Sequence, residues 1–269
     1  MSNGVIPFLK WAGGKRWLVN SNELKLPESF NTYIEPFLGG GAMFLKLSPS
    51  KALLSDLNPE LINTYSVIRD NPKEVEKRLR ALQGQHDKDF YYEIRAKKYR
   101  GKIERAVQFL YLNRTCWNGL YRVNLQGQFN VPIGTKEKVV LDTDDFVATS
   151  NILKNALLMS CDFEETIERA REGDFIFVDP PYTVQHNMNG FIKYNETLFS
   201  WEDQERLLMC LLKAKARGAK ILLTNADHES IRDLFSGLGQ YRSVSRHSVL
   251  AGKSNCRGST TEATFCSWL

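Results

Sequence analysis

The amino-acid sequence predicts an α/β fold in which a doubly wound, open parallel sheet carries an inserted, mainly helical segment. Short apolar runs recur up to residue 60 and again from residue 155, each bounded by glycine, proline or an acidic residue. The residues between these two regions are charged, with apolar side chains at helical spacing. Short strands that alternate with helical patterns are typical of βαβ units. We therefore expect one domain formed by residues 1–60 and 155–269, and a helical domain formed by residues 61–154.

The expected strands are short and rich in apolar and β-branched residues: they lie at residues 32–37, 52–55, 157–161, 175–178 and 220–225, with two more within the tail 241–269. Helices are expected after Asn58 and Asn71, where asparagine can cap and the following proline fits the first helical position. Another follows Ser200, with Asp203 three residues on and an apolar face for the core. Residues 187–195 predict a glycine-containing loop, and residues 250–258 predict a basic connection that could touch phosphate.

Composition limits the class of protein. Hydrophobic residues make up 42% of the chain and charged residues 25%, as in soluble globular proteins. There is no run of 18 apolar residues and no leader-like amino terminus, so we expect a cytoplasmic protein without a membrane span. The five cysteines are scattered without a CxxC pair, and the four histidines show no HExxH spacing. We therefore expect reduced thiols and no metal site.

The net charge of +5 is concentrated in one part of the chain. Residues 69–105 carry 12 Lys and Arg against 7 Asp and Glu, a surplus equal to that of the whole sequence. A local basic surplus is compatible with binding a polyanion, although most such runs are solvated helix surface.

A glycine turn follows the expected strand at 32–37. Gly39, Gly40 and Gly41 separate Phe37 from an apolar helical stretch, and the next strand ends on Asp56. An acidic residue at that place can accept hydrogen bonds from a ribose diol. A full dinucleotide fingerprint would need glycine at Phe44. The pattern therefore favours an adenosine-type ligand without a pyrophosphate, a description that S-adenosylmethionine fits.

The segment Asp179-Pro180-Pro181-Tyr182 follows the apolar run at 175–178. Each proline fixes its own φ and restricts the residue before it, so Asp179 and the Pro180 carbonyl can be held as fixed acceptors beside the Tyr182 ring. Taken alone, the segment could also be a stiff turn. Because ligands bind beyond the carboxyl ends of parallel strands, we expect this segment, the glycine turn and Asp56 to form one site.

Residues 113–132 alternate polar, aromatic and basic side chains without clear helix or strand periodicity. Arginine and asparagine can read guanine and adenine edges, and a loop aromatic can stack on bases. This stretch therefore indicates contact with nucleic acid, unless it is an aromatic loop folded into a small subdomain.

Four segments resemble the signature segments of one family and occur in the same order. They are Phe8-Leu9-Lys10-Trp11-Ala12-Gly13-Gly14-Lys15, Glu35-Pro36-Phe37-Leu38-Gly39-Gly40-Gly41, Asp56 and Asp179-Pro180-Pro181-Tyr182. The sequence resembles the Dam-type amino-group adenine DNA methyltransferases with the alpha-class motif order. The resemblance covers nearly the whole chain. It implies a Rossmann-like, S-adenosylmethionine-dependent sheet with an inserted helical recognition domain, and double-stranded DNA, read at GATC, as the partner.

The resemblance also implies residue roles. The residues implied to contact S-adenosylmethionine are Trp11, Lys15, Asp56 and Asp179, with Phe37, Gly39 and Gly41 shaping the same pocket and Asp162 and Phe163 near its adenine. The residues implied to contact DNA are Lys10 and Arg122 on guanines, Leu120 and Pro132 in reading the target, Trp117 as a wedge in the base stack, and Asn118 beside it. A monomer is expected in solution, with two copies on a palindromic site as the alternative.

An exocyclic amino group is a poor nucleophile until acceptors draw its hydrogens. Asp179 and the carbonyl of Pro180 are expected to be those acceptors, Pro181 to stiffen the segment, and Tyr182 to stack on the base. Methyl transfer then needs in-line positioning, and the base must be flipped out of the duplex.

Several other readings remain open from the residues. An amino-group cytosine methyltransferase would use similar chemistry, and RNA methylation is chemically possible. A ring-carbon cytosine methyltransferase is disfavoured because the chain has no Pro-Cys motif. A nicotinamide oxidoreductase would leave residues 179–182 unexplained, and a silent DNA-binding module would leave the cofactor pattern unused. The sequence does not separate a solitary enzyme from one paired with a nuclease in restriction-modification.

Overall fold

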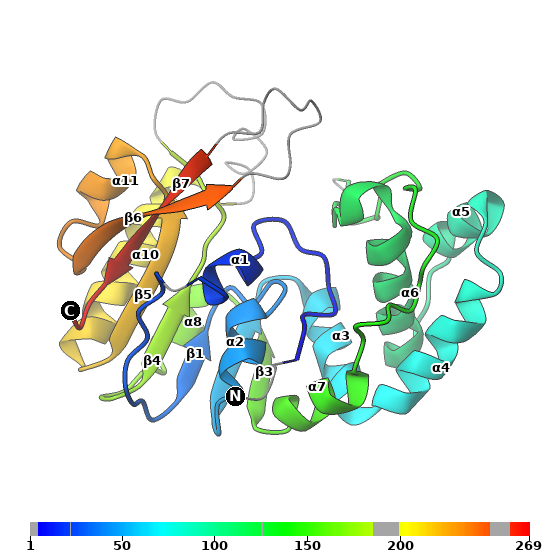
Figure 1. Cartoon of the computed structure of the whole chain (residues 1–269), viewed down its shortest axis with the longest axis horizontal. Coiled ribbons are helices and arrows are strands. Elements are labelled where there is room, and N and C mark those ends of the chain that lie inside the picture. Colours follow the sequence, from blue (N-terminus) through cyan, green and yellow to red (C-terminus); the bar gives the residue numbers. More distant parts are fainter. Residues whose placement is uncertain (1–4, 22, 125, 185–198, 248–258) are drawn as a thin grey trace. The chain divides into compact units, whose positions relative to one another are not determined.

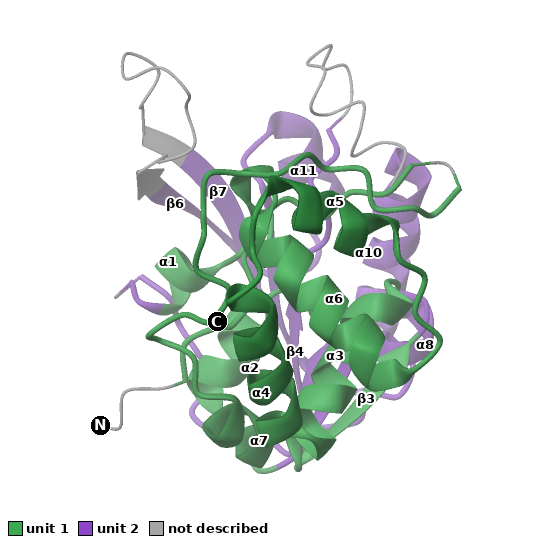
Figure 2. Cartoon of the chain, turned by 90° about the vertical axis from the view of Figure 1, so that its right-hand side faces the viewer, with its two compact units in different colours: residues 1–19, 38–50, 55–160 green, residues 20–37, 51–54, 161–269 purple. Residues whose placement is uncertain are grey.

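The computed structural model describes residues 5–21, 23–124, 126–184, 199–247 and 259–269 (Figure 1). The loop expected at 187–195 and the connection expected at 250–258 lie outside these ranges. The chain divides into two compact units (Figure 2). Unit 1 comprises residues 1–19, 38–50 and 55–160, and unit 2 comprises residues 20–37, 51–54 and 161–269.

The strands form a seven-stranded sheet in the order β3-β2-β1-β4-β5-β7-β6. Their bounds are Tyr33–Glu35 (β1), Ala52–Asp56 (β2), Ala156–Ser160 (β3), Phe175–Val178 (β4), Lys220–Ala226 (β5), Gln240–His247 (β6) and Ser259–Cys266 (β7). Strand β1 pairs in parallel with β2 and β4, and β4 pairs in parallel with β5. Strand β7 is antiparallel to both β5 and β6. The predicted α/β fold with a mostly parallel sheet is confirmed.

The central strands of unit 2 are apolar because both faces of the sheet are covered. Every residue of β1 and of β4 is buried, as expected of parallel strands between helices. Among the described residues of this unit, the helices are α8 (Phe163–Ile167), α10 (Trp201–Ala216) and α11 (Glu229–Leu234). Helix α8 packs against β1, and α10 packs against β5 and α8 (Figure 1).

Helix α10 confirms its sequence signals. The Ser200 hydroxyl accepts from the Asp203 amide while the Asp203 carboxylate accepts from the Ser200 amide, which completes the predicted capping box. Leu207 and Leu211 of its apolar face are fully buried. The capping box and the buried face together hold α10 beside the sheet.

Unit 1 is mainly helical. Its helices are α1 (Arg16–Val19), α2 (Ala42–Leu47), α3 (Pro59–Asp70), α4 (Pro72–Gln83), α5 (Lys88–Ala96), α6 (Lys102–Thr115), the 3₁₀ turn η1 (Trp117–Gly119) and α7 (Phe146–Leu153). Helix α6 packs against α3, α4 and α5. The helical content predicted for residues 61–154 is therefore present. Their role as a separate recognition domain stays a prediction, since the compact units group the glycine turn and the amino-terminal segment with these helices.

The two predicted asparagine caps differ. The Asn58 side chain accepts hydrogen bonds from the amides of Glu60 and Leu61 at the start of α3. The Asn71 side chain makes no capping bond at the start of α4, so that prediction was wrong, and its backbone departs from the extended conformation of Asn58. The Asn71 amide also donates to the Val67 carbonyl at the end of α3. Asn71 is therefore the last cap of α3 and the first cap of α4. Across the described ranges, no helix combines the length and the apolarity that a bilayer crossing needs.

Candidate active site

The segment Asp179-Pro180-Pro181-Tyr182 begins directly after β4, and its anchor at Asp179 comes from β5. Val178, the last residue of β4, pairs with Leu223 of β5. The residues that follow them, Asp179 and Thr224, therefore lie side by side. The Thr224 hydroxyl donates to Oδ1 of Asp179 at 2.7 Å. Thr224 is completely buried. The carboxylate is therefore oriented by the neighbouring strand.

Tyr182 is anchored by a residue that comes 80 positions later in the chain. Its hydroxyl donates to Oε2 of Glu262 on β7 at 2.8 Å, and Glu262 is buried. Burial raises the pKa of Tyr182 well above its ordinary value, and the charges of Asp179 and Glu262 raise it further. The phenol is therefore neutral at physiological pH and acts as a hydrogen-bond donor to Glu262.

The proline pair is held through the carbonyl of Pro181, because proline has no amide hydrogen to donate. Nε2 of Gln204 on α10 lies 3.4 Å from the Pro181 carbonyl oxygen, and Oε1 of Gln204 accepts from Nδ2 of Asn225 at 3.0 Å. Both amide side chains are fully buried. Just beyond, the Thr183 hydroxyl donates to the Phe199 carbonyl at 2.6 Å. Residues 179–183 are thus supported from β5, β7 and α10.

A second buried phenol lies close enough to respond to the charge of Asp179. The Tyr33 hydroxyl on β1 donates to Oε2 of Glu35 at 2.8 Å, and both residues are buried. Burial raises the pKa of Tyr33 well above its ordinary value. The charge of Glu35 raises it further, and the charge of Asp179 adds a smaller increase. The carboxyl ends of β1 and β4 therefore share one polar centre within an apolar sheet.

An aromatic cluster lies after β1 in the same unit. The rings of Phe37 and Phe163 stack with centroids 5.4 Å apart, and Phe199 meets Phe37 edge-on at 5.6 Å. The guanidinium of Arg206 on α10 lies over the Phe163 ring at 4.1 Å. The predicted neighbours Phe37 and Phe163 are therefore brought together.

Asp162 is engaged by protein groups. Its carboxylate caps α8 through the Glu164 amide and forms a two-pronged ion pair with Arg206, with N–O distances of 2.7 and 3.0 Å. The hydrogen bond from Arg206 is the main cause that lowers the pKa of Asp162. In this arrangement Asp162 fixes the start of α8, and so the place of Phe163.

The glycine turn and Asp56 lie together in unit 1. The Gly39 amide donates to Oδ2 of Asp56 at 3.0 Å, and the Asn58 amide donates to Oδ1 at 3.0 Å. Burial raises the pKa of Asp56 above its ordinary value, against the opposing effect of these two amides. Asp56 is therefore a half-buried carboxylate at a strand end, beside a glycine turn, and its role as an acceptor for a ribose stays a prediction.

Two of the glycines are required by both conformation and space. Gly39 and Gly41 have φ of 46° and 61°, in the left-handed region. A Cβ on Gly39 would lie 2.7 Å from Cδ1 of Trp11, and one on Gly41 would lie 2.8 Å from the Tyr65 hydroxyl. The turn therefore packs directly against Trp11, as the sequence predicted for one pocket.

The amino-terminal segment is fixed on α6. The Lys10 amide donates to Oδ1 of Asn113 at 3.0 Å, and Nδ2 of Asn113 donates to the Lys10 carbonyl at 2.8 Å. The Trp11 ring stacks on Tyr121 with centroids 5.8 Å apart. Lys15 is buried, and its ammonium donates to the Gly13 carbonyl at 2.7 Å. Lys10 and Trp11 are therefore packed against two residues of the stretch 113–132, whose contact with DNA stays a prediction.

We call residues 116–134 the recognition loop. Its ends are joined by bonds from the Trp117 amide to the Pro132 carbonyl at 2.9 Å and from the Gly134 amide to the Thr115 carbonyl at 2.7 Å. Trp117 is 52% exposed and Leu120 is 37% exposed. Nε of Arg122 donates to Oδ1 of Asn130 at 2.9 Å. Asn118 adopts a left-handed φ of 55°, which turns the chain between Trp117 and Leu120.

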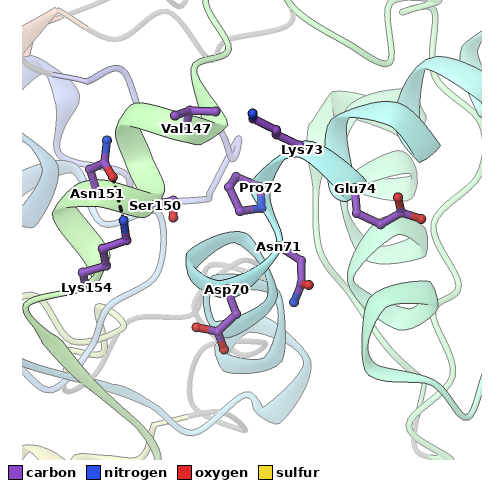
Figure 3. A pocket seen from close by; sticks show the side chains of 9 residues that line it. All are labelled: Asp70, Asn71, Pro72, Lys73, Glu74, Val147, Ser150, Asn151 and Lys154. Carbon is purple, nitrogen blue, oxygen red and sulfur yellow. Dashed lines mark hydrogen bonds between the residues drawn. The ribbon is translucent and has the colours of Figure 1, made fainter.

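A shallow cavity of unit 1 lies apart from these residues in sequence (Figure 3). It is formed where α4 begins, against one side of α7, and contains both acidic and basic side chains (Figure 3). The residues that line it are Asp70, Asn71, Pro72, Lys73, Glu74, Val147, Ser150, Asn151 and Lys154. It contains none of the predicted site residues.

Sequence reasoning missed Thr224, Glu262 and Gln204, which support residues 179–182. Thr224 stands inside a predicted strand, where a threonine is unremarkable. Its relevance depends on the register between β4 and β5. Glu262 is a buried acidic residue within β7, which is unusual unless the carboxylate has a partner.

Comparison with known proteins gives a consistent result. Residues 11–250 match the family model described as D12 class N6 adenine-specific DNA methyltransferase. The chain is 37% identical over 265 residues to the type II methyltransferase M1.LlaDCHI of Lactococcus lactis subsp. cremoris, covering 95% of this chain and 93% of that protein. It is 34% identical to the type II methyltransferase M.MjaIII of Methanocaldococcus jannaschii, covering 94% of each. It is 32% identical to the DNA adenine methylase of Escherichia coli K12, covering 85% of this chain and 83% of that protein.

Proposed function

The chain belongs to the D12 class N6 adenine-specific DNA methyltransferases, and from this premise we propose how its residues carry out the reaction. Asp179 and the Pro180 carbonyl accept the hydrogens of the target amino group, and S-adenosylmethionine is the methyl donor. The observation that carries this proposal is the fixed orientation of Asp179 at the end of β4, held by the buried hydroxyl of Thr224.

The two acceptors make the amino nitrogen nucleophilic. The lone pair of an exocyclic amino group is conjugated with the ring, and hydrogen bonds from both hydrogens favour a tetrahedral nitrogen whose lone pair can attack. Pro180 and Pro181 keep the carbonyl acceptor in place because their φ angles are fixed. When bound, S-adenosylmethionine would supply a sulfonium methyl: the carbon–sulfur bond breaks as the carbon–nitrogen bond forms, and one amino hydrogen leaves as a proton. In-line positioning then carries much of the catalysis, and no covalent enzyme intermediate is needed.

Each unit supplies groups that suit an adenosine-type ligand. In unit 1, Asp56 offers a half-buried carboxylate to the ribose hydroxyls, and Gly39 and Gly41 leave room that a Cβ would fill. Phe37 and Phe163 offer aromatic faces for the adenine of the donor. Trp11 and Lys15 would complete the set by contacts of their own, as in the family pattern.

Tyr182 is proposed to stack on the target adenine. Its hydroxyl is engaged by Glu262, which fixes the ring. Flipping the base out of the duplex costs a few kcal/mol, and stacking contributes roughly 1–3 kcal/mol per base. Stacking on Tyr182 can therefore offset much of the cost of flipping.

The recognition loop is proposed to read GATC. Arg122 and Lys10 would contact guanines, Leu120 and Pro132 would take part in reading the target, and Trp117 would fill the gap left by the flipped base, with Asn118 shaping the turn. The exposure of Trp117 and Leu120 supports this assignment, because side chains that enter a duplex must first be accessible. We further propose that the protein acts as a monomer, and the type II names of two relatives favour a role in restriction-modification.

The test is transfer of tritiated methyl groups to duplex DNA, followed by nucleoside analysis and mapping of the modified site. The proposal expects N6-methyladenine at GATC. Methylation of adenine in another sequence would overturn the GATC assignment alone. Retained activity of Asp179→Ala would overturn the assignment of the catalytic acceptor, with the fold checked by circular dichroism.

A further inference from the structure

Thr224 occupies a position where valine would satisfy every requirement of the sheet. It lies within β5, between the buried residues Leu223 and Asn225, and is itself completely buried. Valine has the same shape and a strong preference for strands. A buried hydroxyl costs roughly 1–3 kcal/mol unless it is hydrogen-bonded. The hydroxyl therefore needs a partner, and the nature of that partner indicates its role.

The main partner of the Thr224 hydroxyl is Asp179. Its oxygen lies 2.7 Å from Oδ1 of Asp179 and 3.4 Å from the carbonyl oxygen of Val178, and it also hydrogen-bonds with the neutral hydroxyl of Tyr182. A hydroxyl has a single hydrogen, and a short bond to a carboxylate is roughly twice as strong as a bond to a neutral acceptor. The hydrogen therefore goes to the carboxylate.

The two phenols that respond to the charge of Asp179 donate elsewhere. Tyr182 gives its hydrogen to Glu262, and Tyr33 gives its hydrogen to Glu35. Each phenol also has one hydrogen to give. The donor from the neighbouring strand is therefore Thr224, which the register of β4 and β5 places beside Asp179.

We propose that Thr224 is a positioning residue for methyl transfer: its hydroxyl fixes the plane of the Asp179 carboxylate and thereby the direction in which that group accepts a hydrogen of the target amino group. The terminal torsion of an aspartate side chain is broad when nothing restrains it. Displacements of about 1 Å in a positioned group can cost roughly 10²-fold in rate. This proposal rests on the role proposed above for Asp179.

The test compares Thr224→Val with Thr224→Ser. The valine variant keeps the shape and removes the hydroxyl, and we expect kcat to fall roughly 10- to 100-fold while KM for DNA and for S-adenosylmethionine changes less than about 3-fold. The serine variant restores the donor, and we expect kcat within about 5-fold of the unmodified enzyme.

A pH profile separates positioning from a purely structural role. A hydrogen bond to the charged form of a carboxylate favours ionisation, so removing the donor moves the acid limb of kcat to higher pH. We expect that shift in Thr224→Val and its absence in Thr224→Ser. A variant that only loosens the sheet would lower thermal stability and leave the limb in place.

The chain offers a matched control in Thr264, which pairs with Thr224 from β7. Its hydroxyl donates at 3.2 Å to the Arg242 carbonyl of β6, which lies on the other side of β7 from β5. Thr264→Val makes the same chemical change in the adjacent strand, and we expect kcat to be unchanged. Unchanged kcat in Thr224→Val, or equal losses in the valine and serine variants, would overturn the proposal. Activity retained in Asp179→Ala would instead overturn the proposed function, so the two failures are distinguishable.

Discussion

The recognition loop and the segment at residues 179–182 are supported in opposite ways. The two ends of the loop are joined by backbone hydrogen bonds, side chains of α5 hold its Val131 carbonyl, and Trp117 and Leu120 are exposed. The segment at 179–182 is partly buried and is held by the side chains of Thr224, Gln204 and Glu262 on three other elements. The exposed side chains of the loop can therefore change with local consequences, whereas each residue of the segment that carries a side-chain bond depends on a buried partner in another element.

This difference has a kinetic counterpart. We expect changes at residues 179–182 or their supports to lower kcat on every DNA sequence. Changes in the recognition loop should alter the choice of sequence or the cost of base flipping, and should leave the chemical step intact once the base is in place.

The largest expected effect is that of Asp179→Ala. Removing the charged acceptor should lower kcat by roughly 10²- to 10⁴-fold, because a positioned acid–base group contributes about that much. Duplex binding, measured by fluorescence anisotropy, should stay within about 3-fold. Asp142→Ala is the control, since it removes a carboxylate whose side chain is 87% exposed. Parallel loss of DNA binding in Asp179→Ala would contradict a purely catalytic role.

Arg122→Ala tests whether the recognition loop determines the choice of DNA sequence. Losing a contact to a base edge should reduce discrimination at one position of the site by about 1–3 kcal/mol, measured as kcat/KM on a set of singly substituted duplexes. Asn130→Ala should have a smaller effect at the same position, because Asn130 accepts from Nε of Arg122. Arg80→Ala on α4 is the charge-matched control. A uniform loss across all duplexes would make Arg122 a phosphate contact.

Trp117→Ala should raise KM for an intact duplex roughly tenfold, because the side chain that fills the gap is lost. The same variant should act almost normally on a duplex in which the target adenine is mispaired, since part of the flipping cost is then absent. An equal defect on both duplexes would rule out the wedge role.

The smallest expected effect concerns pH and the donor. Since burial raises the pKa of Asp56, this carboxylate takes up a proton at higher pH than an ordinary aspartate. The protonated form accepts hydrogen bonds from the ribose less well, so affinity for S-adenosylmethionine should fall as pH falls, beginning above the ordinary aspartate range. Isothermal titration calorimetry should show this limb in the unmodified protein, and Asp56→Asn should bind a few-fold more weakly with the limb removed. If the affinity of Asp56→Asn for S-adenosylmethionine still fell at low pH, a titratable group other than Asp56 would be responsible.

Much of the fold follows from local sequence. The apolar runs of β1, β4 and β5 are short, and glycines or acidic residues end them, so both element type and position could be predicted. The capping box at Ser200 was equally local. Asn71 failed as a side-chain cap because it also closes the preceding helix, a conflict that a four-residue pattern does not reveal.

The supports of the site could not be predicted in the same way. The role of Thr224 depends on the register between β4 and β5, and that of Glu262 depends on β7 lying between β5 and β6. Register and strand order are set by packing of the whole sheet. The motif at 179–182 could therefore be found from its residues, while the side chains that orient it required the structure.

The position of β7 also bears on when the protein can become active during synthesis. Tyr182 obtains its hydrogen-bond acceptor from Glu262, 80 residues later in the chain. At synthesis rates of about 5–20 residues per second, the ribosome needs roughly 4–16 s to make that interval. Until β7 enters between β5 and β6, a nascent chain carries the Asp-Pro-Pro-Tyr sequence without one of its supports. Competence for methyl transfer is therefore acquired late, when the final strand completes the sheet.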